Sequence, residues 1–186
     1  MKIIKTEFTG LFIIEPRVFA DKRGYFFESY NQKELRKHKL LFESLQDNES
    51  LSSANVIRGL HYQLNPMAQA KLIRVIKGRI RDVALDLRKG SPTYGRWKAV
   101  DLDSESKNQM FIPRGFAHGF SVLSSEAIIL YKCDNYYSPD HERGIDLNDP
   151  ALSIDWGIDP LMAIISQKDS TNPSFDQAEN NFQYMP

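Results

Sequence analysis

The sequence is poor in cysteine: Cys133 is the only one among 186 residues. One thiol excludes an intramolecular disulfide and fits the reducing cytoplasm, where we expect the protein to act. An excess of one charge is also missing, because 24 Lys and Arg residues are matched by 24 Asp and Glu residues. A broad nucleic-acid surface needs a basic excess, so we expect no nucleic-acid partner.

Long apolar runs are missing as well. The run from Ala127 to Tyr131 is among the longest, and a transmembrane helix needs about 20 apolar residues. The charged start breaks at Glu7, before any stretch typical of a signal peptide. We therefore expect no membrane partner. The sequence has no glycine-rich phosphate loop of Walker or Rossmann type either, so side chains must hold any bound nucleotide.

Short β segments separated by Gly, Pro, Asn and Asp dominate the sequence. Apolar alternation around Lys77-Gly78 predicts a hairpin over residues 71–87. Further strands are predicted at residues 11–15, 25–30, 56–63, 97–102, 109–112, 119–123 and 127–137. This many short strands indicate a sandwich, jelly roll or small barrel.

The pattern predicts one all-β domain over residues 1–186. Gln32 to Lys39 contains helix formers without Gly or Pro, which favours a short surface helix. After Tyr137 the sequence is rich in Pro, Asp and Asn. We expect an extended C-terminal segment that packs over the strands, with at most one helical turn.

Four histidines are candidates for chemistry. His38 and His141 lie in segments expected to be solvent-exposed. His61 lies in a predicted strand, where alternation places it with Gly59 and Gln63, opposite Arg58 and Leu60. Taken alone, that segment fits a hydrogen-bonded structural histidine better than a functional one.

His118 strengthens the functional interpretation, because Gly115 and Gly119 bracket it. Glycines suit a tight turn that presents a polar group to a cavity. A metal site has no positive signal: position 63 is Gln, and no second histidine stands near His61. We therefore expect no metal.

Acid–base chemistry is the alternative, because an imidazole can take and return a proton near neutral pH. A carboxylate on the other ring nitrogen would fix the tautomer. Asp82, Asp86 and Asp169 are candidates between which the pattern does not choose. A tyrosine is a candidate acid, and Tyr131, Tyr136 and Tyr137 are placed in one predicted strand, although such clusters usually pack a wall.

Cationic side chains complete the candidate set. Lys71 opens the predicted hairpin, where a lysine facing a cavity would stabilise an enolate oxygen, although exposure is the usual state at a strand end. Arginine forks match phosphate oxygens, so a diphosphate site is expected from Arg23, Arg58, Lys168 and Arg114.

Several motifs together resemble the dTDP-4-dehydrorhamnose 3,5-epimerase family, which has a cupin-type jelly-roll fold. They run in the family's order from about residue 12 to 173. The motifs lie at residues 19–28, 46–50, 58–63, 69–72, 78–88, 91–95, 112–120, 131–133 and 166–169. Trp156-Gly157 departs from the family's frequent Trp-Pro without an expected effect on catalysis.

The resemblance implies roles for these residues. His61 would remove protons from C3 and C5 of a dTDP-4-keto-6-deoxy sugar, with Asp169 as its partner. Tyr131 would return a proton on the opposite face, and Lys71 would steady the enolate. The resemblance implies no cofactor, because the substrate already carries the ketone. The residues implied to bind the substrate are Arg23, Glu28, Gln46, Asn48, Arg58, His118, Tyr137, Glu142 and Lys168.

The sequence is consistent with three functions. The first is inversion of C3 and C5 to give dTDP-4-dehydro-L-rhamnose, by a homodimer. The second is epimerisation at C3 alone, or ketoisomerisation of a related sugar. The third is a sugar-binding protein without activity, against which the set of His61, Asp169, Lys71 and Tyr131 argues. Tyr131 favours the double epimerase, because single-carbon relatives differ around the acid.

Overall fold

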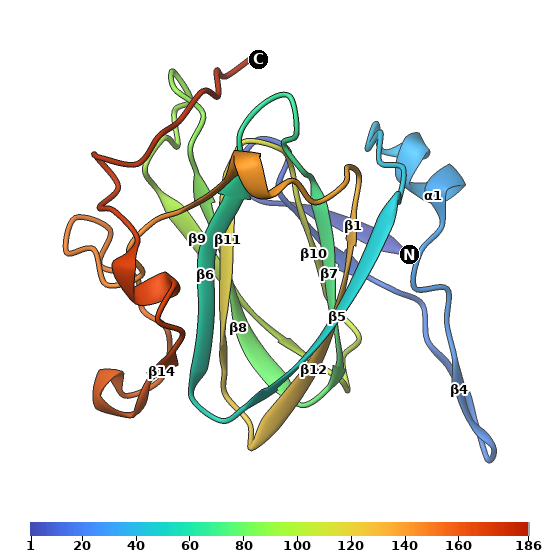
Figure 1. Cartoon of the computed structure of the whole chain (residues 1–186). Helices are drawn as coiled ribbons and strands as arrows, with labels where there is room; N and C mark the ends of the chain where they lie inside the picture. The colour runs from blue at the N-terminus through green and yellow to red at the C-terminus, as the bar shows by residue number, and fades with distance from the viewer. Residues whose placement is uncertain (186) are drawn as a thin grey trace.

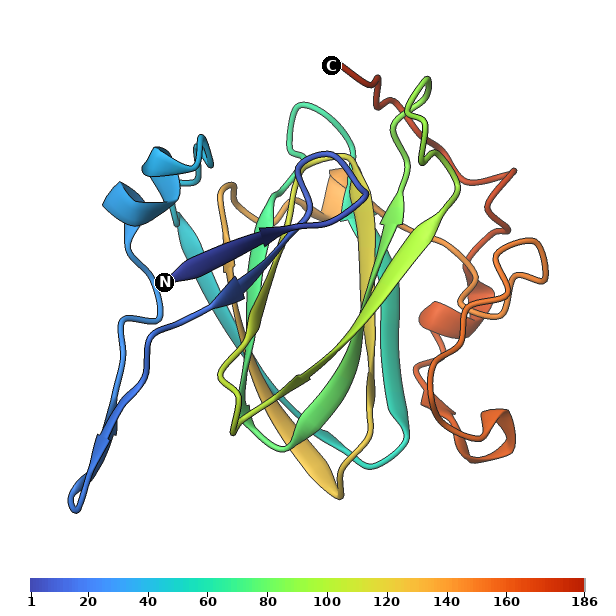
Figure 2. The same cartoon turned by 180° about the vertical axis from the view of Figure 1, so that it is seen from behind.

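Two antiparallel sheets face each other in a cupin-like jelly roll, as predicted (Figures 1 and 2). The computed structural model describes residues 1–185. The first sheet has the order β1 (Lys2–Lys5), β2 (Phe12–Glu15), β10 (Gln109–Ile112), β7 (Lys71–Lys77), β12 (Glu126–Cys133) and β5 (Gln46–Ser53). The second has the order β13 (Glu142–Gly144), β6 (Val56–Gln63), β11 (Phe116–Val122), β8 (Arg79–Asp86) and β9 (Trp97–Asp103).

Alternating side chains separate the interior between the sheets from their outer surfaces. Ile73 and Val75 of β7 are buried in the interior cluster with Ile80 of β8. Leu72 points the other way, into an outer cluster with Leu35. The hairpin predicted around Lys77-Gly78 is confirmed by β7 and β8.

The helix α1 (Gln32–Lys37) covers part of the first sheet's outer surface. The side chain of Asn31 caps it by accepting from the Glu34 N–H. Leu35 is fully buried and anchors it. The predicted end at Lys39 was wrong, because Lys39 has φ = 62°, in the left-handed region that ends a helix.

A hairpin of β3 (Phe19–Asp21) and β4 (Gly24–Phe26) projects away from both sheets (Figures 1 and 2). The strand predicted over residues 25–30 was therefore too long. Three apolar side chains on the hairpin remain exposed, namely Phe19 at 51%, Tyr25 at 59% and Phe26 at 68%. Such exposure of large aromatic side chains is unusual, because folded proteins bury most of them.

The segment after β12 runs over the outer surface of the second sheet (Figure 1). It is largely extended, and β14 (Ile164–Ile165) pairs with β6. The prediction of at most one helical turn was wrong, because short 3-10 turns form at η1 (Pro139–His141), η2 (Pro160–Met162) and η3 (Asp169–Thr171). Proline at the start of η1 and η2 suits a first helical position.

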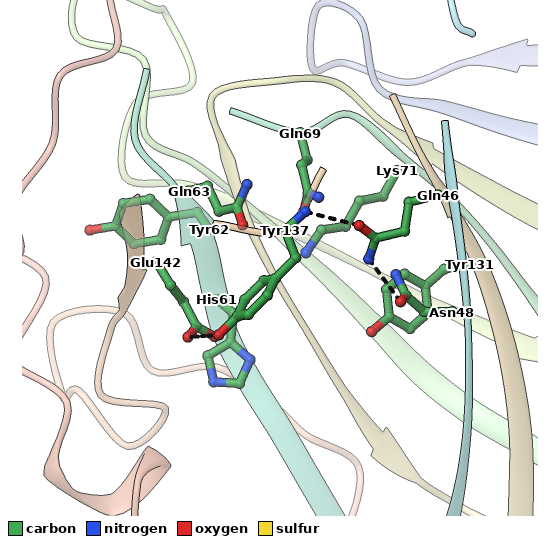
Figure 3. Close-up of a pocket in the computed structure, with 10 residues that line it drawn as sticks. All are labelled: Gln46, Asn48, His61, Tyr62, Gln63, Gln69, Lys71, Tyr131, Tyr137 and Glu142. Carbon is green, nitrogen blue, oxygen red and sulfur yellow. Dashed lines mark hydrogen bonds between the residues drawn. The ribbon is translucent and has the colours of Figure 1, made fainter. Parts of the chain in front are cut away.

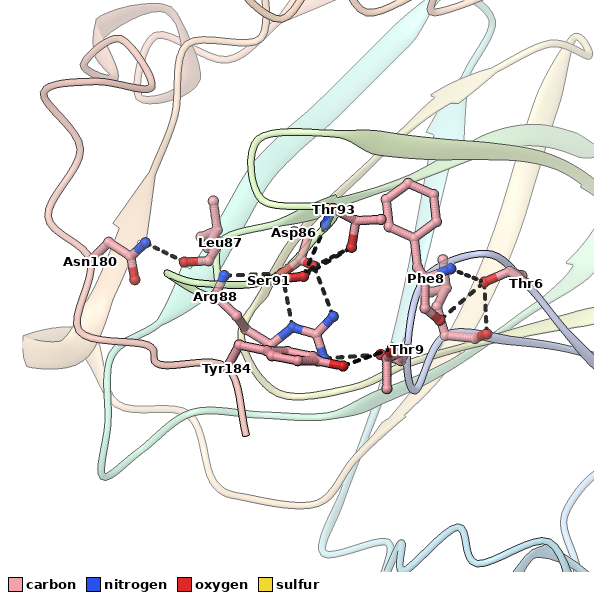
Figure 4. A network of polar contacts seen from close by, with 11 residues as sticks. Thr6, Phe8, Thr9, Asp86, Leu87, Arg88, Ser91, Thr93, Asn180 and Tyr184 are labelled. Carbon is pink, nitrogen blue, oxygen red and sulfur yellow. Dashed lines mark hydrogen bonds and ion pairs between the residues drawn. The ribbon is translucent and has the colours of Figure 1, made fainter. Parts of the chain in front are cut away.

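A polar network fastens the end of the chain to the sheets (Figure 4). Arg88 donates Nε and Nη2 to the two carboxylate oxygens of Asp86, both at 2.8 Å. Its Nη1 donates to the Thr9 carbonyl at 2.9 Å, and its guanidinium lies over the Tyr184 ring. Three distant parts of the sequence thus meet at one arginine.

Within residues 1–185, no helix is long and apolar enough to cross a membrane.

Candidate functional site

Two glycines bring the strands that carry the histidines close together. Gly59 on β6 has φ = 135°, and a Cβ there would lie 2.5 Å from the Cα of Gly119 on β11. Only glycine tolerates both the backbone conformation and the contact. In this arrangement His61 lies directly opposite His118.

A β-bulge changes which side chains of β6 share a face. Gly59 and Leu60 together stand opposite the single residue Gly119, because His61 pairs with His118 and Arg58 with Phe120. Arg58 and His61 therefore line the same cavity. The prediction that strict alternation separates Arg58 from His61 was wrong, and the extra residue is the reason.

His61 is bonded to Asp169, 108 residues further along the chain. His61 Nε2 lies 2.6 Å from Asp169 Oδ1, and the carboxylate is almost fully buried. Burial raises the pKa of Asp169, but hydrogen bonds from His61 and from the Gly59 N–H lower it more, so the pKa lies below its usual range. Asp169 is thus a carboxylate that holds the imidazole in place.

The other two candidate partners of His61 are engaged elsewhere. Asp82 lies 2.7 Å from His118 Nε2. Asp86 is bound by Arg88, Ser91 and Thr93 in the network of Figure 4. His118 is in the middle of β11, so its predicted placement in a tight turn was wrong.

Lys71 and Tyr131 lie on the opposite sheet and line the same cavity as His61. Burial lowers the pKa of Lys71, an effect that Cys133, Asp82 and Glu142 partly offset. Burial raises the pKa of Tyr131, and Cys133 adds to this, so its phenol keeps its proton at neutral pH. Lys71, predicted by default to be exposed at a strand end, is instead half-buried.

The mouth of the cavity carries linked polar side chains (Figure 3). Gln46 donates to Asn48 at 2.9 Å and accepts from the Tyr137 N–H at 2.9 Å. Glu142 accepts from the Tyr137 hydroxyl at 2.8 Å and from Lys168 at 2.5 Å. Burial raises the pKa of Glu142, but Lys168 and Tyr137 lower it more, so the group is ionised.

Two adjoining cavities share His61, Lys71 and Tyr131. One has a volume of about 230 Å³ and the other of about 290 Å³. The first is also lined by Gln46, Asn48, Tyr62, Gln63, Gln69, Tyr137 and Glu142. The second is also lined by Ser50, Arg58, His118, Phe120, Ser166, Lys168 and Asp169. Such a space fits a small polar ligand.

Some predicted residues do not line this cavity. Arg23 lies on the projecting hairpin and is paired with Asp21 at 2.6 Å, and Glu28 follows that hairpin. Arg114 pairs with Asp134 instead of joining Arg58 and Lys168. The prediction that Tyr131, Tyr136 and Tyr137 share one strand was wrong. β12 ends at Cys133, before Tyr136 and Tyr137.

Other residues that line the cavity were not predicted from the sequence, above all Ser50. Its Oγ is buried without a hydrogen-bond partner in the described residues. Ser50 lies on β5, which was not predicted as a strand. The available signal was the period-2 row of polar residues Gln46, Asn48, Ser50 and Ser52.

Within residues 1–185, no three His, Cys, Asp or Glu side chains are grouped so that they could hold a metal ion. The polar groups at the cavity suit proton transfer. A histidine held by a carboxylate faces a protonated phenol across a half-buried lysine. Such a cavity in a jelly roll of this kind defines an acid–base isomerase of the cupin class.

Comparisons with known proteins agree with this class. The family model described as dTDP-4-dehydrorhamnose 3,5-epimerase matches residues 5–177. The enzyme of that name from Shigella flexneri is 49% identical over 183 residues, with 96% of this chain and 98% of the relative covered. This chain belongs to the dTDP-4-dehydrorhamnose 3,5-epimerase family, and it is an enzyme, an epimerase.

Solved structures are similar over nearly the whole chain. The 3,5-epimerase from Legionella pneumophila, solved with dTDP-4-keto-L-rhamnose, has a TM-score of 0.95 and 41% identity, covering 100% of this chain and 99% of that one. A 3'-monoepimerase from Streptomyces bikiniensis has a TM-score of 0.85 and 30% identity, covering 92% of this chain and 86% of that one. The fold alone therefore does not distinguish single from double epimerisation.

Proposed function

We propose that this chain inverts C3 and C5 of dTDP-4-dehydro-6-deoxy-D-glucose to give dTDP-4-dehydro-L-rhamnose. The observation that carries the proposal is that His61 on one sheet, held by Asp169 of η3, faces Tyr131 on the other sheet. Inversion requires a proton to leave one face of a carbon and return on the opposite face. A base and an acid on opposite walls meet that requirement.

His61 is the proposed base. Asp169 holds Nε2, so Nδ1 is the nitrogen left to take a proton from the carbon beside the ketone. The C–H electron pair moves into a new C=C bond, and the carbonyl pair moves onto oxygen to form an enolate. The Asp169 carboxylate stabilises the imidazolium that results. The lysine ammonium of Lys71 stabilises the enolate oxygen.

Tyr131 is the proposed acid. Its phenol gives a proton to the carbon from the face opposite His61, the ketone re-forms, and the configuration is inverted. The imidazolium then returns its proton to solvent, and the phenolate takes one up. The same sequence at the second carbon completes the conversion without any change in oxidation state.

Exchange with deuterated water tests this function. With dTDP-4-keto-6-deoxyglucose, deuterium should enter both C3 and C5. Label at C3 alone would indicate a single epimerase, and an absence of label would indicate a binding protein. His61→Ala should abolish exchange at both carbons while dTDP still binds, whereas the control His38→Ala, at the end of α1, should exchange normally. Exchange in His61→Ala at the wild-type rate would refute the assigned base.

The nucleotide diphosphate is proposed to lie along Arg58, Lys168 and the mouth residues. Arg58 and Lys168 supply positive charge in the cavity. Gln46, Asn48, Tyr137 and Glu142 surround its opening (Figure 3). His118 is proposed to contact the sugar. Arg23 and Glu28 belong to this set only if they come from another copy, because within one chain they lie away from the cavity.

A homodimer supplies that second copy. The β3–β4 hairpin exposes Phe19, Tyr25 and Phe26, and an isolated two-stranded hairpin is marginally stable in water. The strand β5 also forms an open sheet edge that favours pairing. Sedimentation equilibrium should give a mass of twice the chain mass. Phe26→Ser should shift the measured mass toward that of one chain, and it should also weaken dTDP binding. A monomeric wild type would refute the dimer.

We propose that the chain acts as one domain in the cytoplasm. The single buried thiol, Cys133, fits that compartment.

A further inference from the structure

A second histidine–carboxylate pair borders the cavity, and none of the proton transfers described above uses it. His118 Nε2 lies 2.7 Å from Asp82 Oδ1. Asp82 is fully buried, and His118 is 7% exposed. His118 stands opposite His61 in the sheet, so the two imidazoles lie on neighbouring strands. A fully buried carboxylate is costly unless it has a partner or a task.

The protonation of His118 follows from its surroundings. Burial lowers its pKa, the Asp82 carboxylate raises it, and Lys71 and His61 lower it further, so that the pKa lies below its usual value. The ring is therefore neutral at neutral pH and has one N–H. Because an ionised carboxylate only accepts hydrogen bonds, that proton must be on Nε2. Nδ1 then carries a free lone pair.

Nδ1 is open to the cavity. Within residues 1–185, no hydrogen bond is made to Nδ1. The side-chain atoms that are both fully enclosed and without a partner include Ser50 Oγ and Asp82 Oδ2, but not this nitrogen. Nδ1 therefore has no partner in the described part of the chain and is still accessible. His118 lines the same cavity as His61, Lys71 and Tyr131. The cavity thus presents one acceptor nitrogen at a place that the proton transfers leave unused.

A ketosugar can satisfy an acceptor in only one way. Its carbonyl and ring oxygens also accept, so only a hydroxyl donates. Resting on the proposed function, we propose that Asp82 is a positioning residue that fixes His118 as the Nε2–H tautomer. His118 Nδ1 then accepts a hydrogen bond from a ring hydroxyl of the substrate. The Asp82–His118 pair thereby orients the sugar. If the sugar ring were turned over, its carbonyl oxygen would face His118 Nδ1, which is also an acceptor, and would lie away from the Lys71 ammonium.

Asp82→Asn tests the positioning role. The amide of Asn is able to donate to Nε2, which moves the ring proton to Nδ1 and turns the acceptor into a donor. Nitrogen-15 NMR of labelled histidine, assigned with His118→Ala, should show this change of tautomer. We expect kcat/KM for the ketosugar to fall about 10- to 100-fold, the effect of one buried hydrogen bond. The Kd for dTDP should change less than about twofold, because dTDP lacks the keto-hexose that His118 would contact.

Asp86→Asn is the matched control. Asp86 lies on the same strand and is equally buried, but its partners are Arg88, Ser91 and Thr93. Asp86→Asn should lower the stability of the fold. At temperatures below its unfolding midpoint, the His118 tautomer and kcat/KM should stay unchanged. Asp82→Asn combined with His118→Ala should lose no more activity than His118→Ala alone, because Asp82 acts through that ring.

Wild-type protein gives an independent test should Asp82→Asn fold poorly. The equilibrium mixture of the two ketosugar nucleotides should shift the Nδ1 resonance of His118, and dTDP alone should not. An Nδ1–H tautomer in the wild type, a tautomer unchanged in Asp82→Asn, or losses that add in the double variant would overturn the proposal. Failure of the proposed function would appear instead as missing deuterium exchange in the wild type.

Discussion

Replacing Arg88 with alanine should remove several kcal/mol of folding free energy. The guanidinium makes two hydrogen bonds to a fully buried carboxylate, a third to the Thr9 carbonyl, and stacks on Phe116 and Tyr184. The Arg88 side chain is 11% exposed, so solvent screens this pair only slightly. Breaking a buried pair typically costs about 3–5 kcal/mol.

The structure places the expected value near the lower end of that range. Asp86 keeps its hydrogen bonds from Ser91 and Thr93, both at 2.7 Å, so the orphaned charge is partly satisfied. The lost contacts with two rings add about 0.5 kcal/mol each. We therefore expect a loss of about 3–4 kcal/mol. With an m-value of about 2 kcal/mol/M, the urea midpoint should fall by roughly 1.5–2 M.

Urea unfolding at a fixed protein concentration measures this change. Arg79→Ala is the matched control, because Arg79 pairs with Asp101 at 2.6 Å but its side chain is 57% exposed. That exposed pair should contribute at most about 1 kcal/mol. A loss in Arg88→Ala no greater than in Arg79→Ala would refute the reasoning that burial makes the Asp86 pair important.

Three further predictions concern the site. Asp169→Asn should lower kcat about 10²- to 10⁴-fold with dTDP binding retained, because the amide no longer holds the productive tautomer; steady-state kinetics would contradict this if kcat were unchanged. Gly59→Ala should destabilise the fold by about 1–3 kcal/mol from its backbone conformation alone, with an additional cost from overlap with Gly119. Thermal unfolding against Gly90→Ala measures that additional cost, because Gly90 also has a positive φ, 85°, but a Cβ there meets nothing within 4 Å. Because burial lowers the pKa of Lys71, the pH–rate profile should fall on its alkaline side at a pH below 10.5, the ordinary lysine value. Lys71→Arg should move this alkaline fall to higher pH. If the fall does not move, a group other than Lys71 causes it.

Much of the fold was predictable because side-chain alternation is a local property of the sequence. β7 and β8 were predicted from apolar residues at every second position around a glycine turn. β5 was missed because its inward side chains are polar: Gln46, Asn48 and Ser50 face a ligand cavity instead of an apolar core. A strand that serves a binding site lacks the pattern used to find strands.

The site was harder to predict for the same physical reason. The sequence pattern left Asp82, Asp86 and Asp169 as equal partners of His61, since only the path of the C-terminal segment brings Asp169 to the imidazole. The resemblance to the family selected Asp169, and the 2.6 Å contact agrees. Arg58 was assigned to the wrong face of β6 because a one-residue bulge reverses the alternation of side chains. The bulge forms where β6 pairs with β11, and this pairing is not visible in the local sequence.

The contact between Gly59 and Gly119 restricts how this cavity can be redesigned. The wall formed by β6 and β11 has no room for a new side chain at either glycine, since a Cβ on Gly119 would lie 2.8 Å from the Arg58 carbonyl oxygen. The opposite wall is different, because Asn48 and Ser50 of β5 are ordinary strand positions that border the cavity. Variants selected to accept bulkier sugars should therefore change at β5 and leave the paired glycines untouched.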